Sequence, residues 1–219
     1  DLCETATLAY LKSLASNGVR VLDYPNAFNY SKIMNFGAAN SSSDFICFLN
    51  NDTEVVEPNW LGFLLDHAVQ PGIGVVGSKL IYPSGAIQHL GLAFGYGGTC
   101  GHVFSGMLPE SNDLKELSNS CFEVSAVTFA CALVSKENFL ALGGLNEKFK
   151  VGLNDVDFGI RATSFNKTTI VCGSSCLVHH ESKTRRSLRS PLGFLRAMRE
   201  VMLFLRMYPQ PEILERYFL

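Results

Sequence analysis

The feature of the sequence that most constrains its fold is a continuous apolar run, Phe-Ile-Cys-Phe-Leu, at residues 45–49. Such a run, too short for a helix and without alternation, is typical of a strand that is buried on both faces. Further apolar runs lie at 19–22, 73–81, 124–134 and 168–178. Segments with helical spacing lie at 8–14, 31–39, 60–69, 136–142, 156–165 and from Pro191 to about 207. Strands that alternate with helices predict an α/β layer fold with a mainly parallel sheet.

The composition is that of a folded chain with one basic end. Of the 219 residues 47% are hydrophobic, and the net charge of −2 excludes disorder and a strongly basic surface for nucleic acid. The longest stretch without Asp, Glu, Lys or Arg, at 80–109, contains seven Gly and therefore does not predict a membrane-spanning helix. Residues 183–219 hold 8 of the 18 Lys and Arg but 3 of the 20 Asp and Glu. We therefore divide the chain into a domain at 1–186 and a basic, amphipathic helical segment at 187–219.

Seven cysteines are scattered among apolar neighbours, and no two of them form a CxxC pair. Cys172 and Cys176 stand four residues apart in an expected strand, which is not the spacing of a metal or redox pair. The pattern predicts buried, reduced thiols in a cytosolic protein.

Three polar clusters follow the ends of expected strands or begin an expected helix. They are Asn50, Asn51 and Asp52; Asn154, Asp155 and Asp157; and His179 and His180. Ligand sites of open α/β sheets lie at the carboxyl ends of the strands, where carboxylate and imidazole groups together suit Mn²⁺ or Zn²⁺. Each cluster also has an ordinary structural interpretation, because Asn and Asp shape turns, an Asp caps a helix, and Asp157 and Arg161 are spaced as an i,i+4 ion pair.

These clusters belong to a longer series of segments that resembles the inverting family 2 glycosyltransferases, and among them the rhamnosyltransferase-like members that build surface polysaccharides. The series runs from about residue 5 to 186, with segments at 35–40, 48–55, 77–91, 143–149, 154–158 and 179–185. The resemblance implies a GT-A-like fold, which is an α/β three-layer sandwich with a mainly parallel sheet. Residues 1–5 are similar to the stretch that follows the fold's first strand–helix–strand unit. We therefore expect that unit, and part of the nucleotide pocket, to be lacking from the chain.

The resemblance also implies a reaction, the metal-dependent transfer of a sugar from a nucleotide-sugar donor to a glycan or lipid-linked acceptor, with inversion at the anomeric carbon. Asp52 matches the metal-binding carboxylate of the family's DXD segment. Asn50 takes the first acidic position, so that Asn50, Asn51 and Asp52 form a donor side with less charge. His179 matches the histidine that completes the site for Mn²⁺ or Mg²⁺, with His180 as the alternative.

Asp155 matches the family's catalytic base, and the dipole of the helix that begins there predicts a lowered pKa for it. The candidates for contacts with the acceptor or the phosphates are Lys79, Gln88, His89, Asn154 and His180. The Gly-rich stretch at 85–119 is expected to be irregular. Its part at 85–106, with Gln88, His89 and His102, is either a mobile loop on the acceptor side or a permissive surface connection.

Two alternatives to a glycosyltransferase stay open: a non-catalytic GT-A remnant that binds a glycan or a partner chain, and a metal-dependent hydrolase that uses the same Asp and His side chains. The C-terminal helix has two interpretations as well. Three arginines lie beside an apolar stripe of Leu195, Met198, Met202 and Leu205; they are Arg196, Arg199 and Arg206. The helix either packs on the domain with a solvated basic face or rests on anionic lipid, as a peripheral membrane contact of a cytoplasmic protein at the inner face of the membrane.

Overall fold

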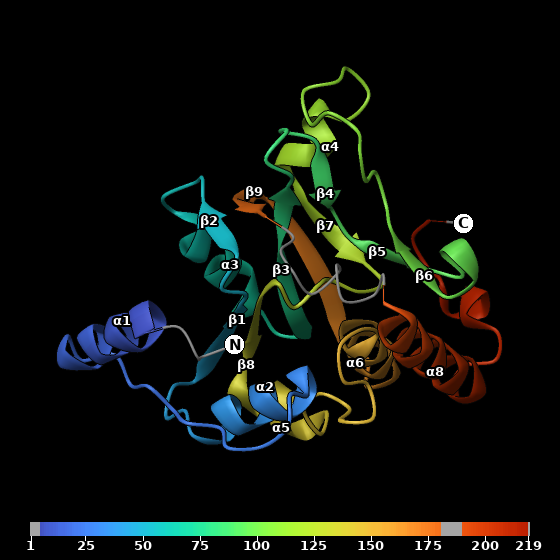
Figure 1. The fold of residues 1–219 in the computed structure, drawn as a ribbon. Coiled ribbons are helices and arrows are strands. Elements are labelled where there is room, and N and C mark those ends of the chain that lie inside the picture. Colours follow the sequence, from blue (N-terminus) through green and yellow to red (C-terminus); the bar gives the residue numbers. More distant parts are fainter. Residues whose placement is uncertain (1–4, 181–189, 219) are drawn as a thin grey trace.

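A computed structural model describes residues 5–180 and 190–218, whose arrangement is shown in Figure 1. The family-like segment after residue 180 and the boundary at 186/187 lie outside the described residues. The helices are α1 (Thr5–Ser16), α2 (Tyr30–Ala39), α3 (Trp60–Ala68), α4 (Lys115–Asn119), α5 (Lys136–Ala141), α6 (Asn154–Ser164) and α8 (Pro191–Met207), with 3₁₀ turns η1 (Tyr96–Gly98) and η2 (Pro211–Leu214). The strands are β1 (Phe45–Leu49), β2 (Thr53–Val55), β3 (Ile73–Ile81), β4 (Ile87–His89), β5 (Leu92–Phe94), β6 (Cys100–His102), β7 (Cys121–Val124), β8 (Cys131–Ser135) and β9 (Thr168–His179).

The main sheet has the strand order β1-β8-β3-β9-β2, and β4 and β7 extend it by pairing with β3 and β9. Strands β3 and β9 are parallel, whereas every other described pair in this sheet is antiparallel. The sheet is therefore mixed, and the prediction of a mainly parallel sheet is wrong. Alternation of helices and strands does not set strand direction by itself. Strand β4, for example, follows β3 through a tight turn, and tight turns join antiparallel strands.

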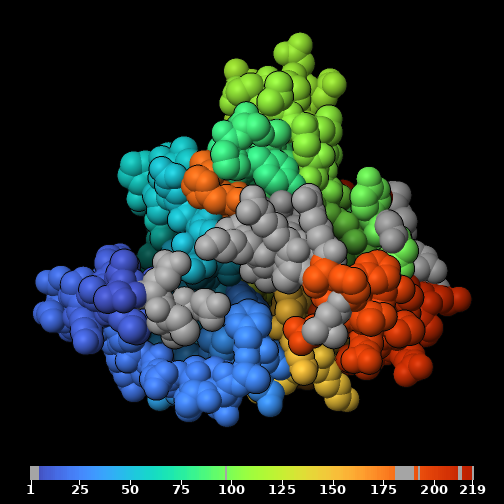
Figure 2. Space-filling model, in the orientation of Figure 1, coloured from blue at the N-terminus to red at the C-terminus, as the bar shows by residue number. Residues whose placement is uncertain are grey.

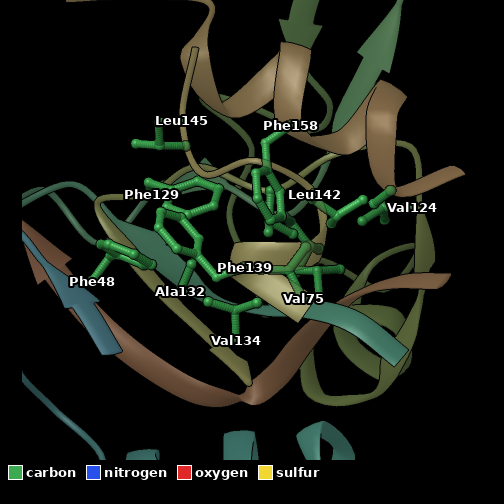
Figure 3. Packing of buried hydrophobic residues seen from close by; sticks show 14 of the residues in the cluster. Phe48, Val75, Val124, Phe129, Ala132, Val134, Phe139, Leu142, Leu145 and Phe158 are labelled. Carbon is green, nitrogen blue, oxygen red and sulfur yellow. The ribbon is translucent and has the colours of Figure 1, made fainter. Parts of the chain in front are cut away.

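Helices cover both faces of the sheet, which confirms the α/β layer prediction. Successive residues of β3 point to opposite faces, so that Val75 belongs to the core under α2, α5 and α6, and Val76 to the core under α3. Four aromatic rings fill the first core, with neighbouring centroids 5.0 to 5.7 Å apart: Phe48, Phe129, Phe139 and Phe158 (Figure 3). The packing of these rings fixes the positions of the ends of β1 and β8 and of the start of α6.

Three local predictions differ from the structure. The segment 19–22 forms no strand and is exposed. The apolar stretch 124–134 is not one strand: it contains the end of β7 and most of β8, which are separated by the irregular residues 125–130. The Gly-rich stretch is more ordered than expected, because it contributes β4, β5 and β6, and residues 87–94 are all buried. It is therefore neither a mobile loop nor a surface connection over that range.

The prediction of reduced thiols is wrong for Cys121 and Cys172, which form a disulfide between β7 and β9. Cys47, Cys100, Cys131 and Cys176 are free. The side chain of His67 lies close to both bonded sulfurs, and these three residues are the only potential metal-ligand group of this kind found in the described part of the chain. A disulfide sulfur is not a thiolate ligand, so this group is not a metal site in the observed state.

Helix α8 packs on the domain along one side. Phe204 is fully buried, and its ring lies 6.3 Å from that of Phe149 and 5.0 Å from that of Tyr208. The helix lies at the surface beside α6, at the right of the views in Figures 1 and 2. Its exposed side carries the apolar stripe and the three arginines named above.

Candidate active site

Most of the candidate residues line one cavity of about 740 Å³. Its walls come from the turn after β1, from β4 and β9, and from the start of α6. Among the predicted site residues, the cavity is lined by Asn50, Asn51, Asp52, Gln88, Asn154, Asp155 and His179. Residues as far apart in the sequence as Asp52 and His179, which are separated by 127 positions, thus line one cavity, as the polar clusters predicted.

The metal side of the cavity is built where β2 pairs with β9. The turn between β1 and β2 is closed by the hydroxyl of Thr53, which donates to the carbonyl of Asn50 at 2.7 Å. Thr53 lies opposite His179 in the sheet, and the amide of His180 donates to the carbonyl of Asp52 at 2.9 Å. This pairing places Asp52 Oδ1 3.1 Å from His179 Nε2.

The second ring nitrogen of His179 is also engaged. Its Nδ1 lies 2.6 Å from Gln88 Oε1, and Gln88 Nε2 donates to the carbonyl oxygen of His179 at 3.3 Å. The side chains of His179 and Asp52 are 13% and 20% exposed, so both remain accessible from the cavity. Two cis ligands of an octahedral ion at about 2.1 Å lie about 3 Å apart. The carboxylate–imidazole pair therefore fits Mn²⁺ or Mg²⁺ in both chemistry and spacing.

The base side of the cavity is the first turn of α6. Leu153, with φ of 62°, turns the chain sharply into the helix, and the side chain of Asn154 accepts a hydrogen bond from the amide of Asp155. Burial raises the pKa of Asp155, although hydrogen bonds from the Val156 amide and the Thr128 side chain act in the opposite direction. The prediction of a lowered pKa is wrong, because desolvation outweighs the helix terminus. A raised pKa makes the ionised carboxylate a stronger base.

Two neighbours of Asp155 have different roles. The side-chain nitrogen of Asn154 is buried at the cavity wall, and no described residue accepts a hydrogen bond from it. Asp157 points into the protein, where its buried carboxylate accepts from Arg161 at 2.8 Å, from Tyr208 at 2.9 Å and from Asn146 at 3.3 Å. The Asn154 amide can thus donate a hydrogen bond to a ligand, whereas the hydrogen bonds of Asp157 stabilise the fold.

Three other candidates do not line the cavity. The ammonium of Lys79 is turned toward α4, where it donates to the carbonyl of Ser118 at 2.7 Å, and burial lowers its pKa. His89 is fully buried and contacts His102. His180 is exposed, with its Nε2 3.1 Å from a carboxylate oxygen of Glu54 at the surface.

Glu200 of α8 contacts the site in a way that no local pattern indicates. Its carboxylate accepts from three successive amides, Lys150 at 2.7 Å, Val151 at 3.2 Å and Gly152 at 3.0 Å. These residues lead into Leu153 and Asp155, and two of them line the cavity. In the sequence Glu200 is one charged residue of an amphipathic helix. Only the packing of α8 shows that it holds the loop before the catalytic candidate.

Comparisons with known proteins show the family to which the chain belongs. The family model described as glycosyl transferase family 2 matches residues 4–141. The O-antigen biosynthesis protein RfbC of Myxococcus xanthus is 36% identical over 183 residues, which are 83% of this chain and 14% of that protein. The uncharacterized protein y4gI of Sinorhizobium fredii (strain NBRC 101917 / NGR234) is 37% identical over 189 residues, 84% of this chain and 20% of that protein. The chain thus spans at most a fifth of the length of these two curated relatives.

Two solved structures share the fold at low sequence identity. GalNAc-T7 with UDP, GalNAc and Mn²⁺ has a TM-score of 0.63 and 14% identity, over 80% of this chain and 35% of that chain. The mannosyltransferase PcManGT of Pyrobaculum calidifontis, in complex with GDP-Man and Mn²⁺, has a TM-score of 0.57 and 12% identity, over 90% of this chain and 52% of that chain. The fold is that of the GT-A glycosyltransferases. Together with the match over 4–141, these likenesses identify the chain as a member of glycosyl transferase family 2.

Proposed function

We propose that this domain carries out the metal-dependent, inverting transfer of a sugar from a nucleoside diphosphate sugar to a hydroxyl of a glycan or lipid-linked acceptor, in the synthesis of a cell-surface polysaccharide. The observation that carries the proposal is that the Asp52–His179 pair and Asp155 line the same cavity. The O-antigen role in the name of RfbC and the Mn²⁺ in both solved structures support it.

Asp52 Oδ1 and His179 Nε2 are the protein ligands of Mn²⁺ or Mg²⁺ in this proposal. When bound, the cation neutralises the charge that grows on the nucleoside diphosphate as it leaves. Asn50 and Asn51 line the cavity beside Asp52 and provide neutral hydrogen-bonding groups on the donor side. This segment has one carboxylate, Asp52, and would therefore bring a single negative charge to the cation.

Asp155 takes the proton of the acceptor hydroxyl. The oxygen then forms a bond to the anomeric carbon while the bond from that carbon to the diphosphate oxygen breaks, so the configuration inverts. Asn154 sits next to this carboxylate, and its buried amide nitrogen is a donor for an oxygen of the acceptor or of the donor phosphates. The two side chains together orient the hydroxyl for attack.

The proposal is tested by titrating Mn²⁺ into the wild type and into Asp52→Ala by calorimetry. We expect Asp52→Ala to weaken Mn²⁺ binding by about 100-fold or more, because it removes a direct ligand. Glu54→Ala is the matched control, since Glu54 is an exposed carboxylate two residues further along the chain. Equal binding by Asp52→Ala and the wild type would contradict the metal site. Sugar transfer is assayed in the full-length protein. A full-length protein that binds Mn²⁺ but transfers no sugar from a panel of nucleoside diphosphate sugars would be a binding module instead.

The surface of α8 supports a membrane contact for the same domain. None of the helices in the described ranges combines the length and the apolar composition needed to cross a bilayer. The apolar stripe of α8, however, is exposed: Leu195 by 54%, Met198 by 40%, Met202 by 48% and Leu205 by 36%. The three exposed arginines beside it, Arg196, Arg199 and Arg206, complement an anionic lipid surface. A helix resting there would bring a cytoplasmic site to the inner face of the membrane, close to a lipid-linked acceptor.

Co-sedimentation with vesicles tests this contact. We expect binding to vesicles that contain anionic phosphatidylglycerol, weaker binding to neutral phosphatidylcholine vesicles, and release at high salt. Changing Arg196, Arg199 and Arg206 together to Gln should remove the preference for anionic lipid, at about 1 kcal/mol per arginine. Equal sedimentation with both kinds of vesicle, or by the triple variant and the wild type, would refute the membrane contact.

A further inference from the structure

Gln88 of β4 uses both ends of its side-chain amide on one residue, His179. Its nitrogen donates to the carbonyl oxygen of His179 at 3.3 Å, and its oxygen lies 2.6 Å from the ring Nδ1. Gln88 is 4% exposed, so water does not compete freely for these bonds. A double contact of this kind fixes the orientation of the amide, that is, the positions of its oxygen and its nitrogen.

The contacts also fix the proton of the imidazole ring. A carbonyl oxygen only accepts, so the end of Gln88 that faces the carbonyl of His179 is the NH₂ group, and the end that faces Nδ1 is the oxygen. That oxygen only accepts as well, so Nδ1 of His179 carries the hydrogen. In the neutral ring, Nε2 then has a lone pair and no hydrogen. Nε2 lies 3.1 Å from Asp52 Oδ1, which is also an acceptor, so that without a metal this contact is a hydrogen bond only when the ring carries its second proton.

We propose that Gln88 is a positioning residue that holds His179 in the Nδ1–H tautomer, so that its Nε2 lone pair and the Asp52 carboxylate together face a divalent cation. The identity of the cation site rests on the proposed function, whereas the tautomer does not. Residues that orient a ligand histidine through its second nitrogen contribute about 10- to 100-fold in metal affinity. Gln88 makes this kind of contact with Nδ1 of His179.

The strand that carries Gln88 is itself held firmly. The next residue, His89, is fully buried, and its Nε2 accepts from the amide of Thr128 at 3.3 Å. Its Nδ1 lies 2.9 Å from Nδ1 of His102. Burial, with repulsion from His102 and His179, holds the pKa of His89 well below its usual value, so its ring is neutral. Its Nδ1 therefore carries the hydrogen and donates to His102, which ties β4 to β6.

The tautomer is measured directly by NMR of ¹⁵N-histidine-labelled protein without metal, recorded over a range of pH so that the signals of the neutral ring are identified. The chain contains five histidines, so His179 is assigned with the variant His179→Gln. We expect a protonated Nδ1 and a bare Nε2 in the wild type. In Gln88→Leu the proton should move to Nε2, because Asp52 is then the nearest acceptor for the ring.

Mn²⁺ affinity by calorimetry supplies the second readout. We expect Gln88→Leu to bind Mn²⁺ at least about 10-fold more weakly than the wild type. Gln88→Glu keeps an acceptor for Nδ1–H but loses the donor to the carbonyl of His179, so we expect a smaller loss than in Gln88→Leu. Gln70→Leu is the matched control, because Gln70 is exposed at the end of α3 and does not line the cavity. All variants are first compared by thermal unfolding.

The outcomes separate the two proposals. A neutral ring in the wild type with the hydrogen on Nε2 and a bare Nδ1, or equal Mn²⁺ affinity in wild type and Gln88→Leu, would overturn the role of Gln88. If the wild type has the expected tautomer but binds no Mn²⁺, the proposed function fails while the tautomer assignment stands.

Discussion

The metal side and the base side of the cavity are built in different ways. On the metal side, Asp52 comes from the turn before β2, whereas Gln88 and His179 come from β4 and β9, and their contacts join residues 91 and 127 positions apart. On the base side, Asp155 lies in the first turn of α6 and takes hydrogen bonds from its own turn and also from Thr128 and Phe129. The metal side is a product of sheet register, whereas the base side is a helix start that is buried against the segment before β8.

This difference predicts different responses to substitution. A change on the metal side disturbs ligand orientation and leaves the two cores intact, because neither core contains Asp52 or His179. On the base side, the carboxylate proposed for catalysis and the carboxylate that stabilises the fold are only two residues apart. Asp155 faces the cavity, whereas Asp157 faces the interior. The following predictions test that separation.

The largest expected effect is on turnover in Asp155→Asn. We expect the rate of sugar transfer to fall by about 10²- to 10⁴-fold, because the amide cannot take the proton of the acceptor hydroxyl. Mn²⁺ affinity should stay within about twofold of the wild type, since the metal ligands are not touched. Single-turnover kinetics and calorimetry measure the two quantities. Unchanged turnover in this variant would remove Asp155 from the mechanism.

A change two residues further along should act on stability instead. In Asp157→Asn, the partly buried guanidinium of Arg161 faces a neutral amide in place of a carboxylate that is 0% exposed. We expect the free energy of unfolding to fall by about 3 kcal/mol. Urea denaturation checks this, with Asp155→Asn as the control on the same helical turn. If both variants unfolded at the same urea concentration, the two carboxylates would not be separated in role.

The raised pKa of Asp155 gives a smaller, pH-dependent effect of known sign. Because folding raises this pKa, the folded protein binds the proton more tightly than the unfolded chain. This contribution to stability is complete below the usual Asp pKa of about 3.9 and is lost as the pH rises through the raised value. Relative to the wild type, Asp155→Asn should therefore gain thermal stability between acidic and neutral pH. A difference in melting temperature that does not change with pH would argue against the burial of this charge.

The smallest effect is expected at His180, the neighbour of the proposed ligand. Its side chain is 48% exposed and pairs with Glu54, which is 69% exposed. Exposed pairs of this kind contribute between 0 and about 1 kcal/mol. His180→Ala should therefore leave Mn²⁺ affinity within about twofold and stability within about 0.5 kcal/mol. A loss of Mn²⁺ binding in this variant would exchange the roles of His179 and His180.

The sequence predicted the elements of the fold better than their pairing. The helices at 31–39, 60–69 and 156–165 and the strands at 45–49 and 73–81 agree with α2, α3, α6, β1 and β3, because their periodicity is set by burial on one or two faces. Strand direction depends on connections and long-range register, which periodicity does not contain. The segment 19–22 has the apolar residues of a strand but no neighbouring strand to pair with.

The site was predictable to a similar degree. The residue types of Asp52, Asp155 and His179, and their places at strand ends and a helix start, indicated the cavity wall. The environment of each side chain was not predictable. The pKa of Asp155 depends on its burial and on hydrogen bonds from Thr128 and Phe129, and the role of Gln88 depends on a strand in a stretch that the sequence predicts to be a loop.

Glu200 accepts hydrogen bonds from the three amides before α6, and this bears on which residues a functional fragment of the protein must contain. The family match ends at residue 141, yet Asp155 and His179 lie beyond it, and the loop in front of Asp155 is tied to a helix a further 45 residues along. A fragment that ends at residue 141 would keep Asp52 and Gln88 but would lack His179 and Asp155. A cut just before α8 would keep every candidate side chain but leave three backbone amides without their carboxylate. Expression boundaries for this protein should therefore be set beyond α8, where the anchoring helix ends.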